Sequence, residues 1–358
     1  TEGFINILNQ VYNKKIGILK DTDSFISDSV GNSFSYTSYD DLNDLISSLE
    51  KGKINYAIVP RYYSLEDIVK NNLYINYSFK NLTNKIVLHL NSNKKLSSIM
   101  SKYLELFKSK NDLNSYENEY MDFYIKNTDI TEVDTSSLSS KVYTYGYVKN
   151  NTYNMLNGNK LYGYAGEYMN MFSKMANIEF EYKEYQSSDK LKDAIKSGEV
   201  DVAFIDFDYS NEQGLYTVNS FDSSMLAISG TNYPITLKEG LENRNVYVLE
   251  NSYLNQYLKD NYNIKINTAS SITEKALSKG IFVLDEGDYY YNQKNKDLGN
   301  YYVLLKDTYQ GNYKYFVKNS EQNMYDFIDF MLNYTSSDRV KINSINNLVL
   351  SSNNQGGF

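Results

Sequence analysis

The chain of 358 residues contains no cysteine and no tryptophan, and its only histidine is His89. Without cysteine it has no disulfide, no thiolate nucleophile and no cysteine-ligated metal. His89 lies in the alternating segment 85–90, which predicts a strand and a structural role for that side chain. Because no Ser–His or Cys–His pair is available beyond His89, and no acids are paired at a defined spacing, we expect a non-enzymatic protein without cofactor or metal.

Arginine is also scarce. Of the 36 cationic side chains, all except Arg61, Arg244 and Arg339 are lysines, and they are scattered along the chain. The formal net charge is -8 and the sequence pI is about 5.0. Phosphate binding needs clustered Lys and Arg side chains, so we expect no nucleic-acid partner.

No apolar run approaches the length of about 18 residues that a membrane-spanning helix needs. The first residues do not form a basic, apolar signal segment either. We therefore expect the chain to be an excised soluble portion of a longer protein, and the absence of cysteine suits an exported one.

A recurring unit is present instead: an amphipathic helix, a glycine stop and a short buried strand. It occurs at residues 39–59, 189–205 and 272–284, with Gly52 and Gly198 ending the first two helices. Helices that feed short apolar strands predict α/β lobes with largely parallel sheets. Three copies predict three lobes, which suits a chain longer than a usual single domain.

Residues 142 to about 345 resemble solute-binding protein family 3, the amino-acid-binding proteins of the type II periplasmic-binding-protein fold. The resemblance rests on five pieces in the family's order: residues 161–172, 191–204, 217–228, 246–254 and 272–286. It implies a complete two-lobed module over residues 142–345, with lobe one at about 142–228 and 312–345 and lobe two at about 229–311. We place the crossings between the lobes near residues 224–229 and 313–318.

Residues 1–10 correspond to the crossing strand at residues 221–230, and residues 15–21 correspond to residues 245–251. On these pieces, residues 1–126 resemble the second lobe and return helices of a preceding, partial module. The polar, hydroxyl-rich segment 127–141 is interpreted as a linker, and residues 346–358 as a tail. Tandem modules of this kind resemble the sensor regions of bacterial histidine kinases and diguanylate cyclases. The resemblance therefore implies an extracytoplasmic solute-binding sensor of a membrane signalling protein, anchored through segments outside this chain and working by lobe closure around a ligand.

The resemblance also places the candidate ligand contacts. In amino-acid-binding members, the loop after the second buried strand of lobe one carries hydroxyl residues and an arginine for the ligand carboxylate. Here those positions hold Asp206, Asp208 and Gln213, so a carboxylate ligand would meet like charge. We expect a cationic or neutral small solute.

Lobe two contributes Asp285 at the position of the family's ammonium acceptor, with Glu286 and Asp288 beside it, and Ser252 in the turn after its first strand. Tyr153 or Tyr209 would supply the aromatic platform, since the family's position holds Ser188. The alternative for these acids is a structural role, because acidic residues also cap helix amino termini.

Other readings stay open at this point. The module could be the substrate-binding protein of an ABC transporter for amino acids or related small solutes, or a degenerate module that binds another protein chain, and a homodimer is not excluded. The apolar stripe of the segment 95–107 needs a cover, for which we expect the local sheet of residues 15–90 and the module at residues 142–345.

Overall fold

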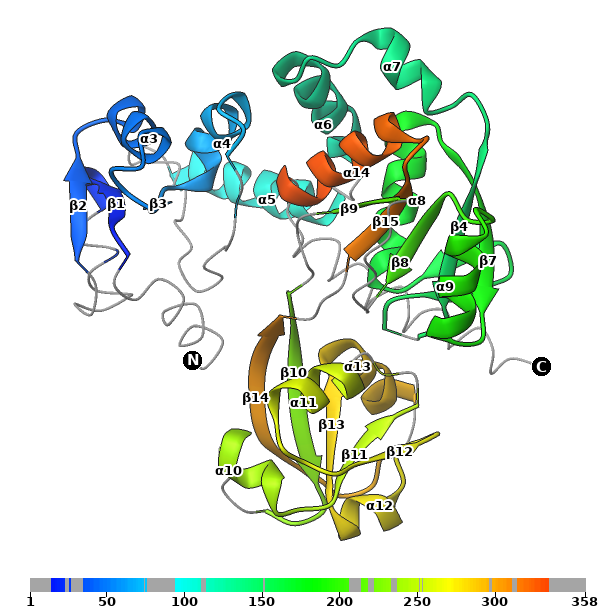
Figure 1. The fold of residues 1–358 in the computed structure, drawn as a ribbon. Coiled ribbons are helices and arrows are strands. Elements are labelled where there is room, and N and C mark those ends of the chain that lie inside the picture. The colour runs from blue at the N-terminus through cyan, green and yellow to red at the C-terminus, as the bar shows by residue number, and fades with distance from the viewer. Residues whose placement is uncertain are drawn as a thin grey trace. The chain divides into compact units, whose positions relative to one another are not determined.

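The computed structural model describes residues 14–22, 26, 35–73, 75, 94–110, 114–150, 152–205, 214–217, 222–232, 237–250, 252, 254–295, 298–310 and 314–334. The chain divides into two compact units. Unit 1 comprises Thr1–Asp112 and Lys126–Thr128, and unit 2 comprises Leu113–Ile125 and Asp129–Phe358. Figure 1 labels the helices and strands of both.

Unit 1 contains a three-stranded parallel sheet in the order β2-β1-β3. Its elements are β1 (Ile16–Leu19), a 3-10 turn (Lys20–Thr22), β2 (Tyr36–Tyr39), α3 (Leu42–Glu50), β3 (Tyr56–Ile58), α4 (Arg61–Lys70) and α5 (Lys94–Lys110). Leu45 and Ile46 of α3 are buried, and Leu45 packs with Leu19 and Ile54, as the amphipathic pattern predicts. The predicted crossing strand at residues 1–10 and the predicted strand at 85–90 lie outside the described residues.

The prediction that the local sheet covers the apolar stripe of α5 is wrong. Leu96, Ile99, Tyr103 and Leu104 are all exposed, with 43–57% of their surface accessible. The helical spacing was correct, but an amphipathic pattern does not say which surface covers the apolar face.

Unit 2 begins with α6 (Asn114–Asn127) and α7 (Glu132–Ser137) and then forms two lobes. We expected α6 to belong to the partial module, but its residues to Ile125 group with unit 2 because Tyr124 is buried against Phe327 and Phe330. The expected linker is partly helical, since Thr131 and Asp134 form a capping box that starts α7.

Lobe one is a five-stranded sheet in the order β7-β4-β8-β15-β9. Its elements are β4 (Val142–Val148), β5 (Met155–Asn157), β6 (Lys160–Tyr162), α8 (Tyr164–Ala176), β7 (Glu179–Tyr185), α9 (Ser188–Lys196), β8 (Val202–Ile205), β9 (Gly214–Tyr216), β15 (Lys314–Lys318) and α14 (Gln322–Tyr334). β4, β7 and β8 are parallel, whereas β15 runs antiparallel to both β8 and β9.

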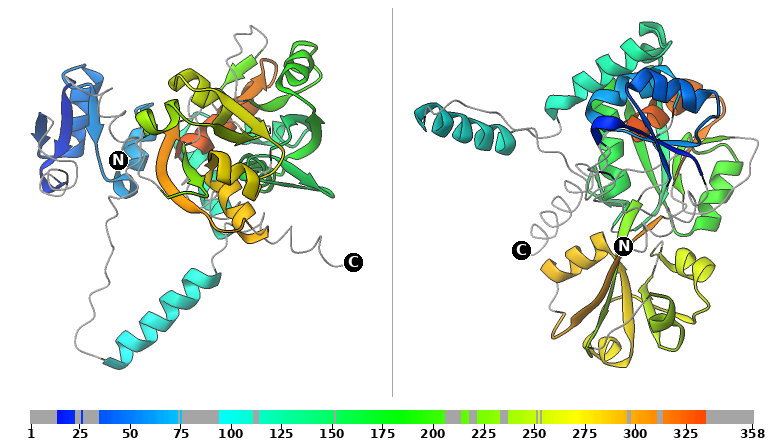
Figure 2. Two further views of the ribbon diagram at one scale, coloured as in Figure 1. Left: turned by 90° about the horizontal axis from the view of Figure 1, so that it is seen from below. Right: turned by 90° about the vertical axis from the view of Figure 1, so that its left-hand side faces the viewer.

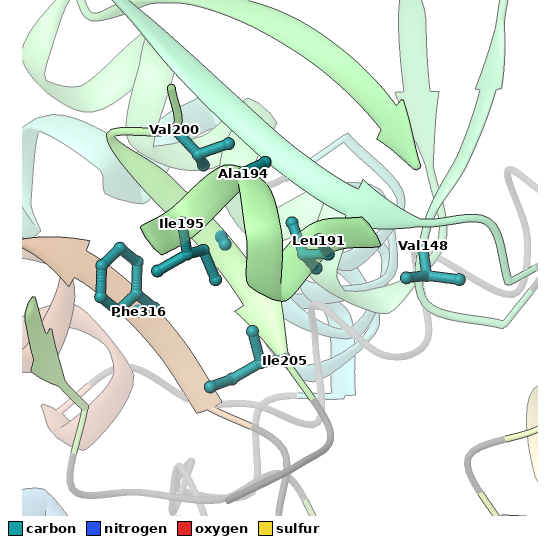
Figure 3. Close-up of a cluster of buried hydrophobic side chains, with 8 residues drawn as sticks. Val148, Leu191, Ala194, Ile195, Val200, Ile205 and Phe316 are labelled. Carbon is teal, nitrogen blue, oxygen red and sulfur yellow. The ribbon is translucent and has the colours of Figure 1, made fainter. Parts of the chain in front are cut away.

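Side chains that alternate along these strands bury both faces of the lobe-one sheet. Leu191, Ala194 and Ile195 of α9 pack on one face against Val148, Ile205 and Phe316, as Figure 3 shows. Ala203 belongs to the same cluster. On the other face, Phe172 of α8 contacts Tyr315 of β15 and Phe327 of α14. Lobe one is therefore a doubly covered α/β layer, as the sequence predicts.

Lobe two has its own five-stranded sheet, in the order β12-β11-β13-β10-β14. Its elements are β10 (Asp222–Ser229), α10 (Leu237–Glu242), β11 (Val246–Leu249), α11 (Leu254–Asn261), β12 (Ile266–Ala269), α12 (Glu274–Lys279), β13 (Ile281–Asp285), α13 (Glu286–Asn295) and β14 (Tyr302–Gln310). Helices lie on both sides of these strands in the right-hand view of Figure 2.

The chain passes between the lobes twice, between Thr217 and Asp222 and again between Gln310 and Lys314. The first passage comes earlier than the expected residues 224–229, which belong entirely to β10 in lobe two. A buried apolar strand has the same sequence pattern in either sheet. The pattern therefore predicted the strand correctly but could not show that it belongs to lobe two. Lobe two therefore begins with β10 and not at residue 229.

Candidate functional site

The site is built around a tight loop at residues 150–154 of lobe one, directly after β4. The side chain of Asn150 accepts hydrogen bonds from the backbone N–H groups of Thr152, at 2.9 Å, and Tyr153, at 3.2 Å. The backbone of Asn154 donates to Asn150 O at 2.7 Å. An Asn side chain that bonds its own following backbone is a standard way to hold a turn.

The amino terminus of α8 fastens the same loop from the other side. The backbone N–H of Tyr164 donates to Thr152 O at 2.8 Å, and that of Gly166 donates to Tyr153 O at 3.1 Å. Gly163, at φ 98°, allows this approach, because a Cβ there would lie 2.4 Å from the Tyr153 carbonyl carbon and oxygen. Otherwise unpaired amides of the helix thus hold the backbone of Tyr153 in place.

The side chain of Tyr153 is 1% exposed and reaches lobe two. Its ring stacks on that of Phe204 of β8, with centroids 5.5 Å apart. Its hydroxyl donates a hydrogen bond of 3.4 Å to Asp285 Oδ2, at the end of β13. A residue predicted as an aromatic ligand contact is therefore in contact with a residue predicted as the lobe-two acid.

Asp285 and Asp288 form the lobe-two side of the contact, and both are buried, at 2% and 5% exposure. Asp285 Oδ1 accepts a hydrogen bond of 2.8 Å from the backbone N–H of Gly287, in the first turn of α13. Asp285 therefore has the capping role that the structural alternative predicts. Its other oxygen, Oδ2, faces lobe one, so a carboxylate that caps α13 through Oδ1 still has an acceptor for lobe one.

Asp288 is an acid of the described site with a shifted pKa. Burial first, and then the nearby Asp285 carboxylate, raise the pKa of its carboxyl from 3.8 to about 7, and the hydroxyl of Thr152 opposes both effects. Thr152 comes from lobe one, so Asp288 also lies at the contact between lobes. Thr152 Oγ1 is buried and makes no hydrogen bond of normal geometry within the described part of the chain.

Glu286, the third acid of the cluster, is neutralised. Lys306 of β14 donates to Glu286 Oε1 at 2.9 Å, and this bond raises the pKa of the Lys306 ammonium. Glu286 is thus an acid of this cluster whose charge an ion pair compensates.

Of the other predicted ligand contacts, only Ser252 lies within the described residues. Ser252 is buried, and its Oγ accepts a hydrogen bond from the backbone N–H of Leu254, the first residue of α11, at 3.3 Å. Its ligand role stays a prediction. Asp206, Asp208, Tyr209 and Gln213 lie outside the described residues. Sequence reasoning missed Thr152, whose only signal was its position next to Tyr153.

The strand orders identify the architecture. In each lobe the first of the three parallel strands lies between the second and the third. The strand that follows a crossing, β15 in lobe one and β10 in lobe two, pairs antiparallel with the third parallel strand and with the edge strand beyond it. Residues 142–334 have the type II periplasmic-binding-protein fold. Two lobes joined by two crossings, each with its own sheet, are the arrangement that the sequence predicts.

No protein-family model matches the chain, and no curated protein matches it. Among solved structures, it is similar to the periplasmic VFT2 domain of Bordetella pertussis BvgS, at 14% identity and TM-score 0.45, over 58% of this chain and 93% of that chain. It is also similar to the GluR0 ligand-binding core in complex with L-glutamate, at 16% identity and TM-score 0.45, over 59% and 99%. A third is a histidine kinase sensor domain with similarity to periplasmic binding proteins, at 16% identity and TM-score 0.43, over 61% and 96%.

The described residues contain no cluster of three or more His, Cys, Asp or Glu side chains placed to hold a metal ion. They also contain no helix that is both long and apolar enough to span a membrane.

Proposed function

We propose that residues 142–334 bind a small solute between their two lobes and report its presence through lobe closure. The observation that carries this proposal is the contact of Tyr153 and Thr152 in lobe one with Asp285 and Asp288 in lobe two. A solute held by both sides of such a contact stabilises the closed arrangement by its differential affinity for it. The module acts by binding and not by catalysis.

The chemistry of the contact favours a cationic or neutral solute. Two carboxyl groups lie on the lobe-two side, and like charges about 4 Å apart repel by about 4 kcal/mol at the effective dielectric of a protein surface. Arg244 is the only arginine of residues 142–334, and it is exposed next to β11. A carboxylate solute therefore lacks a bidentate partner in lobe two, whereas an ammonium group has two acceptors. Thr152 Oγ1 offers a further neutral partner.

The context of the module favours sensing over transport. A separate parallel sheet with the strand order β2-β1-β3 precedes it in the chain, and the three parallel strands of each lobe of the module have the same order. A second unit of this kind fits the tandem sensors that the sequence resembles. We therefore propose an extracytoplasmic sensor region of a membrane signalling protein of the histidine kinase or diguanylate cyclase type, anchored through segments outside this chain.

A thermal-shift screen of the whole chain against polyamines, amino acids, amino-acid amides and neutral sugars tests the binding proposal. A solute that binds the folded state raises the melting temperature, and it does so increasingly above its dissociation constant. We expect a hit among cationic or neutral solutes that weakens at least about tenfold in Asp285→Asn, since such a loss is about 1.4 kcal/mol. Glu199→Gln, an exposed lobe-one carboxylate paired with Lys183, is the matched control and should bind as the wild type does.

A hit that binds Asp285→Asn as tightly as the wild type would place the solute elsewhere. Binding that requires a free carboxylate on the solute would overturn the charge argument.

A further inference from the structure

The two passages between the lobes start from neighbouring positions in lobe one. Thr217 is the last described residue before the first passage, and Tyr315 is the second residue of β15, after the second passage. The backbone N–H of Thr217 donates to Tyr315 O at 3.0 Å, which continues the pairing of β9 with β15 by one residue pair. In return, the backbone N–H of Tyr315 donates to the side-chain Oγ1 of Thr217, also at 3.0 Å. The two ends of lobe one that lead into the passages are therefore fastened to each other.

The side chain of Tyr315 is fully buried and makes two contacts that bear on the candidate site. Its ring meets that of Phe204, the residue opposite it in β8, edge-on with centroids 5.4 Å apart. Phe204 in turn stacks on the ring of Tyr153. Tyr315 therefore packs against the ring that supports the lobe-one aromatic residue of the site.

The second contact of Tyr315 is made by its hydroxyl, which donates to Ala165 O at 2.9 Å in a buried hydrogen bond. Ala165 lies in the first turn of α8, between the two residues whose backbone N–H groups donate to Thr152 O and Tyr153 O. The hydroxyl thus ties β15 to the part of α8 that holds the loop at residues 150–154. One side chain contacts both supports of Tyr153, the stacked ring and the helix that holds its backbone.

We propose that Tyr315 is a positioning residue of the candidate site, which couples the two crossings between the lobes to Tyr153. The inference rests on the proposed function, because it assigns to Tyr315 a part in holding the interlobe contact that a solute would stabilise. Tyr315 acts through Tyr153, whose hydroxyl donates to Asp285 Oδ2 at 3.4 Å. That distance is long for an O–H···O hydrogen bond, so a small displacement of the loop is enough to break it.

A purely structural role of Tyr315 predicts a different result. Its loss would then lower the stability of lobe one, as the loss of any buried tyrosine does, with no specific effect on the interlobe contact. Tyr143 is the matched comparison, because it is also buried in the lobe-one sheet and its hydroxyl also donates to a backbone carbonyl, that of Ser137, at 3.3 Å. It lies near the start of β4, whereas the loop at residues 150–154 follows the end of that strand.

Amide-resolved hydrogen exchange of the solute-free whole chain tests the local step. Tyr315→Phe removes the bond to Ala165 O and keeps the ring. We expect the amides of Tyr164 and Gly166 to exchange about two- to tenfold faster relative to those of β7, the range that one neutral hydrogen bond gives. Tyr143→Phe should leave this ratio unchanged. A wild-type ratio in Tyr315→Phe would overturn the inference.

Single-molecule energy transfer tests the step from Tyr153 to lobe two. The chain has no cysteine, so Asp189→Cys and Ser278→Cys, at exposed positions on α9 of lobe one and α12 of lobe two, accept a fluorophore pair. We expect the fraction of closed, high-transfer molecules to fall at least about twofold in Tyr315→Phe and in Tyr153→Phe. The double variant should lose no more than Tyr153→Phe alone, because both changes act on one contact. Tyr143→Phe should give the wild-type distribution.

Thr217 gives a second route to the same measurement, which decides the matter even where Tyr315→Phe fails to fold. Thr217→Val keeps the shape of the side chain and removes the acceptor of the Tyr315 N–H. We expect it to lower the closed fraction in the labelled chain, whereas Thr217→Ser, which keeps the hydroxyl, should give the wild-type distribution. Wild-type transfer in Thr217→Val would show that the crossings are not coupled to the contact.

The energy-transfer measurement needs no solute, so it and the solute screen fail separately. Additive losses in Tyr315→Phe and Tyr153→Phe, or a distribution that neither variant changes, would remove the positioning role even if a solute binds. Non-additive losses in a chain for which the screen finds no solute would support the positioning role and leave the solute proposal without support.

Discussion

The ring of Tyr153 stacks on the ring of Phe204 with the two planes 22° apart, and the same Tyr153 hydroxyl bonds to Asp285 across the lobe contact. Phe204 is itself fully buried in β8, where it contacts Tyr315 edge-on at 5.4 Å. The core of lobe one therefore fixes the ring of Tyr153, whose hydroxyl contacts lobe two. An aromatic group anchored in this way loses little conformational freedom when the lobes close.

Tyr153→Phe removes the hydroxyl and keeps the stacked ring. A single neutral hydrogen bond is worth about 0.5–1.5 kcal/mol, and a bond to a charged group about 1.5–3 kcal/mol. We therefore expect solute affinity to fall about tenfold while the unfolding of lobe one changes by less than about 1 kcal/mol. Calorimetric titration and thermal unfolding measure the two quantities. Tyr185→Phe, which loses an exposed bond to Glu199, is the control and should leave affinity unchanged.

Gly287→Ala places a methyl group between the lobes. That Cβ would lie 2.6 Å from Thr152 Cγ2, closer than packed atoms approach, while alanine is otherwise well suited to the first turn of α13. We expect the variant to fold normally, to show a longer interlobe distance and to bind solute at least about tenfold more weakly. Lys275→Ala, at an exposed position on α12 of the same lobe, is the matched control. Unchanged distance and affinity in Gly287→Ala would show that the two side chains do not meet in solution.

Affinity for a cationic solute should rise with pH. The raised pKa of Asp288, about 7 in the closed arrangement, means that the carboxyl is neutral below this value and charged above it. A cation gains its second negative partner only in the charged form, so its affinity should increase between about pH 6 and pH 8 and level off above. Titration in two buffers of different ionisation enthalpy should show proton release on binding. A neutral solute should show the opposite or no dependence, and Asp288→Asn should remove the slope for the cation.

Tyr124→Ala tests whether α6 belongs to the folded module. Tyr124 is 2% exposed and lies 4.7 Å from Phe330 and 5.8 Å from Phe327, measured between ring centroids. Removing a buried aromatic ring costs about 3–5 kcal/mol. We expect a lower melting temperature of the module and faster hydrogen exchange in α14. Tyr103→Ala on α5, where Tyr103 is exposed, should change neither, and an equally silent Tyr124→Ala would mean that α6 does not dock.

The regular elements of the fold were predictable because their signals are local. The strands at 142–148, 202–205, 246–249 and 281–285 follow from short apolar runs, and the glycines at 52 and 198 end their helices with positive φ as expected. The helix α7 was not predicted, because a hydroxyl-rich segment resembles a linker. Its Ser136 and Ser137 side chains bond to backbone carbonyls three residues earlier, and the capping box at Thr131 supplies its start.

The site residues of each lobe could be predicted separately, but the contact between the lobes could not. Tyr153 and Asp285 could each be proposed from their position relative to strands and helices. Their mutual contact depends on how two lobes close, and Thr152 becomes relevant only through that closure. The perturbed state of Asp288 likewise needs burial, and the sequence carries no local signal for the burial of one acid among three neighbours.

The most direct test of the account measures the interlobe distance and solute binding on one sample. The Asp189→Cys and Ser278→Cys chain, labelled with a fluorophore pair, is titrated at pH 7.5 with the best solute from the screen. The account predicts that energy transfer rises with the same midpoint as the binding isotherm, and that Asp285→Asn shifts both curves together by at least about tenfold. Saturation of binding with no change in transfer, or a change in transfer that Asp285→Asn leaves untouched, would contradict it.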